Sequence, residues 1–310
     1  MINIRYHLVS LTAVVLAVAV GTGLGTATLS GPLAEDLHDD SRSLRGSNAR
    51  LHDKVADLED ELAARDAYVE EAAPLLLEHR LTGKRMLLVA MPGAGSAAVA
   101  GVAEDLRLAD ATVTGTVRFT DTFTDPQSRE DARDLATRLL PPNVDEVSSD
   151  DDGVTASAAL LAAVLVAHRP AVTAGDRTSV LTGFRAGKLI EYDERITQPA
   201  QGVVIVTGPP VTKPAATAED RNTAVLSAIE RFGTAGPLVV AAPGTGGKGN
   251  PVSAVRTDPA LRKAMSTVDN VGTSLGQLSA VLALVQVAVD RRTGHYGVHD
   301  GADRRLPQPA

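Results

Sequence analysis

Residues 85–101 read RMLLVAMPGAGSAAVAG, and this stretch decides the expected fold. The first seven residues are almost all apolar, which is typical of a buried strand, and Pro92-Gly93 precedes a helix expected to reach about Leu108. Further short strands are expected at ATVTGTVRFT, KLIEY, VVIVTG and PLVVAA, with helical patterns between most of them. Alternating strands and helices predict an α/β domain over residues 83–292, with a mainly parallel, doubly wound sheet covered on both faces.

The composition limits both the core and the partners. Of the 310 residues, 44% are hydrophobic but only 3% are aromatic, so alanine, valine and leucine must fill the core. The net charge of -8 and the lack of a basic cluster argue against a nucleic-acid partner, because phosphate binding needs concentrated positive charge. Cysteine is absent, which excludes disulfides and thiolate metal sites.

The beginning of the chain predicts a membrane helix. No charged residue occurs from Leu8 to Ala34, a length sufficient to cross a bilayer, so a single transmembrane helix is expected within residues 1–33. Arg5 precedes it, which favours a cytoplasmic N-terminus and an extracytoplasmic globular domain. The alternative is a cleaved signal peptide, for which the most apolar part has a suitable length. The spacing of Gly21 and Gly25 would let two such helices pack closely.

A heptad pattern follows and predicts a coiled-coil stalk over residues 34–80. Leucines recur every seven residues and define position d, while a polar asparagine at an inner position a is typical of parallel two-stranded coils. In a parallel homodimer, Lys54 of one chain would attract Glu59 of the other across the seam, whereas Glu61 would repel Asp66. The alternative is one amphipathic helix docked on the globular domain. The seam consists of Leu37, Leu44, Asn48, Leu51, Val55, Leu58 and Leu62.

No motif in the globular domain assembles catalytic chemistry. The loop VVAAPGTGGKGNP lacks the first glycine of a phosphate-binding loop, and Lys248 is followed by Gly249 instead of Ser or Thr. GTSLG at 272–276 matches the sequence pattern of a nucleophile elbow. Asp290, however, would lie too far along the helix from Ser274 to belong to the same catalytic triad. We therefore predict that the protein is not an enzyme.

Two histidines near the end of the chain suggest a metal site. His295 and His299 are four residues apart in HYGVH, and Asp300 adjoins the second. An i, i+4 pair on a helix can chelate a metal, but Gly294 and Gly297 disfavour a helix here. The sequence predicts a flexible tail over residues 293–310 whose metal ligands would be His295, His299 and Asp300.

Four segments together resemble a known family. INIRYHLVSLTAVVLAVAVGTGLG, the heptad segment, STVDN at 266–270 and GHYG at 294–297 are similar, in content and order, to the actinobacterial copper transport protein B family, the MctB-like proteins. The resemblance implies copper efflux or resistance at the cell envelope, with copper as the ligand of the histidine tail. Because Cu(II) accepts imidazole, the two histidines agree with that expectation. The resemblance also allows a second function, that of a dimeric envelope scaffold that binds a partner controlling cell separation or cell-wall hydrolysis.

Overall fold

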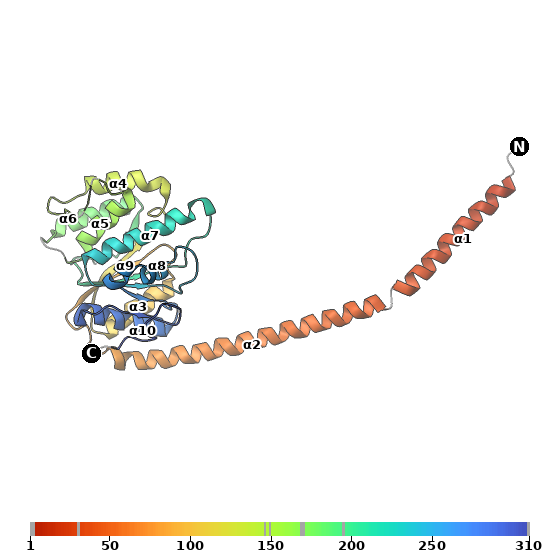
Figure 1. The fold of residues 1–310 in the computed structure, drawn as a ribbon, viewed down its shortest axis with the longest axis horizontal. Coiled ribbons are helices and arrows are strands. Elements are labelled where there is room, and N and C mark those ends of the chain that lie inside the picture. The colour runs from red at the N-terminus through yellow and green to blue at the C-terminus, as the bar shows by residue number, and fades with distance from the viewer. Residues whose placement is uncertain are drawn as a thin grey trace. The chain divides into compact units, whose positions relative to one another are not determined.

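The structure is a computed structural model that describes residues 4–29, 32–145, 147–148, 150–167, 171–193 and 196–308. The chain divides into two compact units, Met1–Arg65 and Asp66–Ala310. The first unit contains helix α1 (Ile4–Leu29) and most of helix α2 (Pro32–Leu77). The second unit contains the last turns of α2 and the sheet with its helices (Figure 1).

Helix α1 corrects one prediction from the sequence. Among the described residues, no helix combines the length and the apolar character that crossing a membrane requires. The predicted transmembrane helix of residues 1–33 is therefore wrong, and the single-pass topology loses its basis. The strongly apolar run from Leu8 to Val20 is shorter than the roughly 20 residues of a membrane span, because glycine and threonine residues follow it. For the predicted close packing at Gly21 and Gly25, a Cβ added at Gly21 would meet no atom within 4 Å. The surroundings of Gly25 lie outside what the structure describes.

A seven-stranded sheet in the order β3-β2-β1-β4-β5-β6-β7 forms the centre of the second unit. Five of its six pairings are parallel, and β3 pairs antiparallel with β2. The strands are β1 (Arg85–Ala90), β2 (Thr112–Phe119), β3 (Ile190–Tyr192), β4 (Gly202–Val206), β5 (Leu238–Ala241), β6 (Ser266–Val268) and β7 (His295–Tyr296).

The antiparallel edge strand corrects the second part of the predicted fold. Most pairings are parallel, but the antiparallel β3 makes the sheet mixed, so the prediction of a parallel, doubly wound sheet is wrong. The reason lies in how the chain leaves α6: Lys188 adopts φ 57°, and Thr120 N–H donates to Leu189 O over 3.1 Å. The chain therefore reaches the sheet beside the end of β2 rather than its start, and Ile190 pairs with Phe119. A parallel neighbour would need a crossover back to the other end.

Helices cover both faces of the sheet (Figure 1). One apolar cluster joins the sheet to α3 and α10 and to the last turns of α2, while the other joins it to α5, α6 and α7 with α4 and α8 beside them. Helix α5 is apolar on all sides and almost entirely buried. The helices are α3 (Ser96–Leu108), α4 (Arg129–Arg138), α5 (Gly153–Leu165), α6 (Ala174–Ala186), α7 (Ala215–Ala235), α8 (Pro251–Thr257), α9 (Pro259–Ala264) and α10 (Ser274–Val285), with a 3-10 turn (Pro126–Ser128) and a π-helical turn (Gln286–Asp290).

The last turns of α2 pack on the start of α10 through polar contacts. Ser274 donates its backbone N–H to Asp66 Oδ1 over 3.1 Å and its hydroxyl to Glu70 Oε1 over 3.2 Å. Ala73 and Leu77 on α2 are buried beside these contacts. A carboxylate near the first N–H groups of a helix is favourable, since those groups lack partners within the helix. Ser274 thus joins two helices, and GTSLG begins a helix instead of forming a nucleophile elbow.

The packing of α2 on α3 predicts a measurable pH effect at Asp105. Burial, then repulsion from Glu104 and Glu70, raises the pKa of Asp105 to about 7. The folded state therefore keeps a proton that the unfolded chain releases near pH 4, so stability falls as pH rises from about 4 to 7. At pH 8, Asp105→Asn should raise the free energy of unfolding by about 1–3 kcal/mol, a gap that closes below pH 4. Urea titrations across this range test it. The control Asp134→Asn, at an exposed position on α4, should stay within about 0.5 kcal/mol of wild type at each pH.

Candidate functional site

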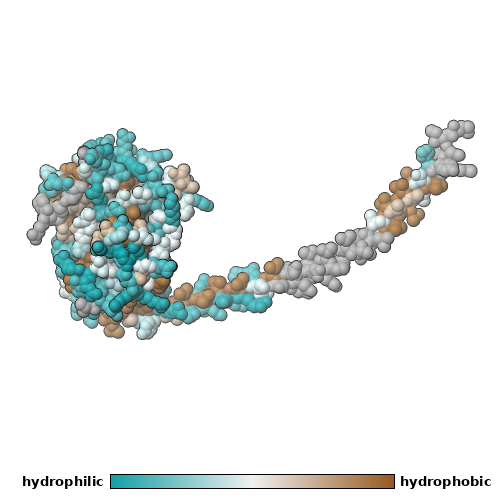
Figure 2. Space-filling view, in the orientation of Figure 1, coloured by the Kyte–Doolittle hydropathy of each residue, from teal (hydrophilic) through white to brown (hydrophobic). Residues whose placement is uncertain are grey.

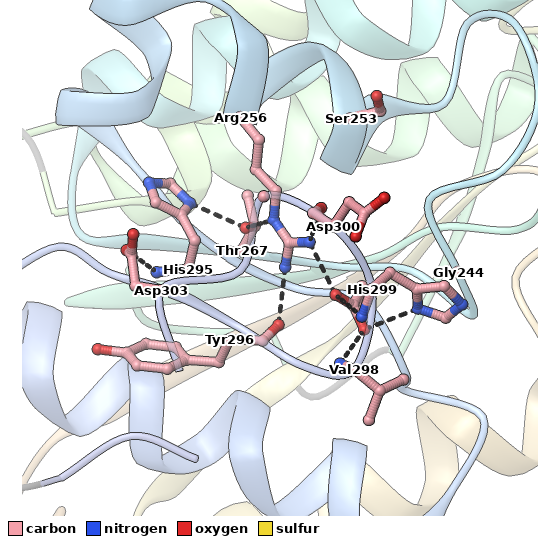
Figure 3. Close-up of polar contacts among 12 residues, drawn as sticks. Gly244, Ser253, Arg256, Thr267, His295, Tyr296, Val298, His299, Asp300 and Asp303 are labelled. Atoms are coloured by element: carbon pink, nitrogen blue, oxygen red, sulfur yellow. Dashed lines mark hydrogen bonds and ion pairs between the residues drawn. The ribbon is translucent and has the colours of Figure 1, made fainter. Parts of the chain in front are cut away.

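The candidate site lies where β6 and β7 end, at the edge of the sheet (Figure 3). Residues 293–310 are expected from the sequence to be a flexible tail, but His295 and Tyr296 form β7 and pair with Thr267 and Val268 of β6. Thr267 N–H donates to Gly294 O over 3.2 Å, and Asp269 N–H to Tyr296 O over 3.2 Å. These backbone bonds hold the segment in the sheet, where His295 is buried.

Both ring nitrogens of His295 are already hydrogen-bonded. Nδ1 lies 2.9 Å from Thr267 Oγ1, and Nε2 lies 3.0 Å from the carbonyl oxygen of Arg262. Arg256 Nε donates to the same threonine oxygen over 2.9 Å, so the threonine hydroxyl is left to donate to Nδ1, and Nε2–H donates to the carbonyl. Burial is the main cause that lowers the pKa of this imidazole. His295 is thus a neutral, buried side chain without a nitrogen open to a metal.

A buried ion pair between Arg256 and Asp269 forms the centre of the site. Arg256 on α8 donates to Asp269 Oδ2 over 2.7 Å, and its side chain is 3% exposed while that of Asp269 is 0% exposed. The guanidinium also donates to the carbonyl oxygens of Tyr296, over 2.8 Å, and Asp300, over 3.2 Å. One arginine therefore connects β6, β7 and the segment that follows them.

Three further contacts to Asp269 explain its ionisation. Val298 N–H donates to Oδ1 over 2.8 Å, His299 N–H lies 3.2 Å from Oδ2, and His299 Nδ1 lies 3.0 Å from Oδ1. Burial alone would raise the pKa of Asp269, but the hydrogen bonds from His299 and Val298, together with Arg256, outweigh it and lower the pKa. Asp269 is a buried carboxylate that stays charged.

Glycine at 297 lets the chain approach this carboxylate. Its φ is 137°, and a Cβ at this position would lie 2.1 Å from Asp269 Oδ1. Any side chain would both strain the backbone and displace the carboxylate. The last residue of the GHYG motif is therefore required to be glycine by the position of the Asp269 carboxylate.

His299 is the accessible member of the site. Its side chain is 45% exposed, and its ring points away from Arg256 toward Gly244 (Figure 3). Nδ1 faces Asp269, whereas no hydrogen bond joins Nε2 to any residue that the structure describes. A carboxylate that orients one imidazole nitrogen while the other is open is the arrangement that metal-binding histidines use. No hydrogen bond joins this imidazole to a hydroxyl group of a described residue.

The structure does not gather the three predicted ligands around one point. His295 is buried against Thr267, His299 faces outward, and Asp300 contributes its backbone carbonyl to Arg256. Within the described residues, no group of three or more histidine, aspartate or glutamate side chains could hold a metal ion. Sequence reasoning missed Arg256 and Asp269. The signal that could have found Asp269 is an aspartate that directly follows the β-branched residues Thr267 and Val268 in STVDN.

Comparison with known proteins gives matches along the whole chain. The family model described as "Copper transport outer membrane protein, MctB" matches residues 1–307. A protein of Mycobacterium tuberculosis named "Copper transporter MctB" is 29% identical over 308 residues, covering 97% of this chain and 98% of the relative. The protein of the same name from Mycobacterium leprae is 30% identical over 311 residues, with the same coverage.

Proposed function

Because this chain belongs to the MctB family of copper transport outer membrane proteins, we propose that it takes part in copper transport and resistance at the cell envelope. The family resemblance of the sequence is confirmed. The match covers the globular unit as well as the helices before it, so the proposal concerns the whole chain. The family name describes transport and does not name an enzyme class. Copper is accordingly the cargo of the protein and not a resident cofactor.

His299 is the residue we propose as the copper contact. The chain has no cysteine, and Met86, Met91 and Met265 are buried in the core, so none of these offers a sulfur ligand at the surface. Imidazole then favours Cu(II) over Cu(I). The open Nε2 of His299, oriented by Asp269, is the single observation that carries this assignment. One protein ligand predicts a weak, exchangeable contact, which suits cargo better than a permanent cofactor.

Titration of the full chain with Cu(II), followed by calorimetry, tests the assignment. We expect His299→Ala to weaken Cu(II) binding about tenfold or more, because the ligand itself is removed. His52→Ala is the control: its imidazole is exposed on α2, but no hydrogen bond or ion pair joins it to a carboxylate of a described residue. Equal losses in the two variants, or unchanged binding in His299→Ala, would show that this is not the copper contact.

The exposed seam of α2 supports a second candidate, a dimeric envelope scaffold. Apolar side chains follow the described part of the helix (Figure 2), and five seam residues remain 50–71% exposed in the single chain. Such a stripe is more exposed than monomers usually tolerate, and a second copy in parallel register would cover it. A partner that controls cell separation or cell-wall hydrolysis would then bind the dimer. The five residues are Leu44, Leu51, Val55, Leu58 and Leu62.

The charges at the end of the seam support a coiled coil that ends near Leu62. Glu61 and Asp66 would repel each other across a parallel dimer. Arg65 pairs with Glu61 over 2.6 Å, and Asp66 accepts the N–H of Ser274, so each carboxylate has a partner within its own chain. Sedimentation equilibrium tests the dimer: the expected mass is twice the 32.1 kDa of the chain, and a mass of 32.1 kDa at all concentrations would exclude it.

A further inference from the structure

A cavity of about 390 Å³ lies beyond the ends of β4 and β5, separate from the His299 site. Its walls are the first turns of α7, the loop before that helix and the glycine-rich loop that precedes α8. Ligands of open α/β sheets bind at this edge, and the volume is at the lower end of the roughly 300–1,000 Å³ of small-molecule sites. The apolar side chains of its lining belong to Val211, Ala215, Ala218, Leu226 and Ala254.

Asn222 fixes the two loops that form the walls. Its Oδ1 accepts the N–H of Val211 over 2.8 Å, while its Nδ2 donates to Val211 O over 3.0 Å and to Lys248 O over 3.5 Å. Gly249, at φ 82°, lies so close that a Cβ would be 2.7 Å from the Cβ of Asn222. This buried amide bridges both walls, so the cavity is a built feature of the fold. The glycine-rich loop does not match the sequence pattern of a phosphate-binding loop, but it forms one wall of this cavity.

Only one charged pair lies in the lining. Lys248 Nζ and Glu219 Oε2 are 3.1 Å apart, and their side chains are 84% and 75% exposed, so they lie at the mouth. An exposed ion pair of this kind contributes little to stability. A ligand can therefore separate the two charges at low energetic cost, provided that it supplies a partner for each of them.

We propose that the cavity binds a free α-amino acid with an apolar side chain. The apolar walls take the side chain, Lys248 takes the carboxylate and Glu219 takes the ammonium group. A zwitterion meets an opposite charge at both Lys248 and Glu219, whereas a ligand with a single charge meets only one of them, so the pair favours a zwitterion. This inference goes beyond copper transport and does not depend on it.

Calorimetry of the full chain with L-leucine tests the proposal. The matched probes are 4-methylpentanoate, which lacks the ammonium group, and 3-methylbutylamine, which lacks the carboxylate. We expect L-leucine to bind and each probe to bind about tenfold more weakly, since each lacks one charged contact. Absence of heat with L-leucine, or equal affinity for all three molecules, would overturn the proposal.

Charge reversal locates the site. Lys248→Glu and Glu219→Lys should each weaken leucine binding about tenfold through like charges, and the double variant Lys248→Glu/Glu219→Lys should restore it. Ala218→Phe should abolish binding by filling the cavity, whereas Ala174→Phe, in the lining of a different cavity, should not change it. Leucine binding that survives Ala218→Phe, or a double variant that stays as weak as the single ones, would place the ligand elsewhere.

Discussion

Replacing Arg256 with methionine should lower the free energy of unfolding by about 3–5 kcal/mol at pH 7, which is a large part of the stability of a typical domain. The substitution leaves the fully buried carboxylate of Asp269 without its cationic partner. It also removes the donors to the carbonyl oxygens of Tyr296 and Asp300, so β7 loses its link to α8. Urea unfolding followed by circular dichroism measures the loss.

The neighbouring Arg262 provides the control for this prediction. Its guanidinium forms an ion pair with Asp303, but the two side chains are 34% and 47% exposed. Arg262→Met should therefore lower the free energy of unfolding by only about 1 kcal/mol or less. The double variant Arg256→Met/Asp269→Asn should recover part of the loss, because no charge remains buried. If Arg256→Met behaved like the control, the buried pair would not be the centre of this edge of the sheet.

If the chain forms the dimer that we propose, lysine at Leu44 and Leu51 should convert it to a monomer, with the mass in sedimentation equilibrium falling from about twice the chain mass to once. Four ammonium groups would then face one another in the seam, where the proposed dimer would bury leucine. Unfolding of the globular unit should stay unchanged, because the two leucines belong to Met1–Arg65. If the protein acts as the proposed scaffold, binding of its partner should disappear together with the dimer.

The control variant for the seam carries the same charges on the outer face of the helix. Ala49→Lys/Ala63→Lys occupies positions b of the heptads and should keep the dimer mass. A double-lysine variant at 44 and 51 that remained a dimer would show that the chain associates through another surface. If both variants dimerised and both kept their function, the parallel coiled coil would be excluded.

The sequence predicts strands β1 to β5, but it does not predict β6 and β7, which lie together at one side of the sheet. RMLLVA, VVIV and LVVA are long enough and apolar enough to be recognised as buried strands, and each is one. KLIEY predicts β3. β6 has three residues and β7 has two, which is too short for a periodicity to be visible. The direction of β3 depends on where α6 delivers the chain, and no residue pattern within β3 encodes that.

The site shows why residue spacing alone is insufficient. His295 and His299 are four residues apart, which suggests a common ligand if they lie on a helix. The positive φ of Gly297 instead separates them, so one ring is buried and the other faces solvent. Their partners come from distant segments: Asp269 is 30 residues from His299, and Arg256 is 40 residues from Tyr296. Contacts between residues so far apart in the sequence can be predicted only if the order of the strands in the sheet is known. The local sequence does not reveal that order.

The position of β7 has a consequence for biosynthesis. During translation, residues 294–304 are synthesised after the other strands of the sheet. Arg256 and Asp269 are therefore synthesised before the backbone groups of Tyr296, Val298 and Asp300 to which they bind. The second unit therefore completes its last strand only after every other strand of the sheet has been synthesised. A message truncated upstream of Gly294 would yield a domain with an open strand edge at β6, a surface that can pair with another chain and promote aggregation.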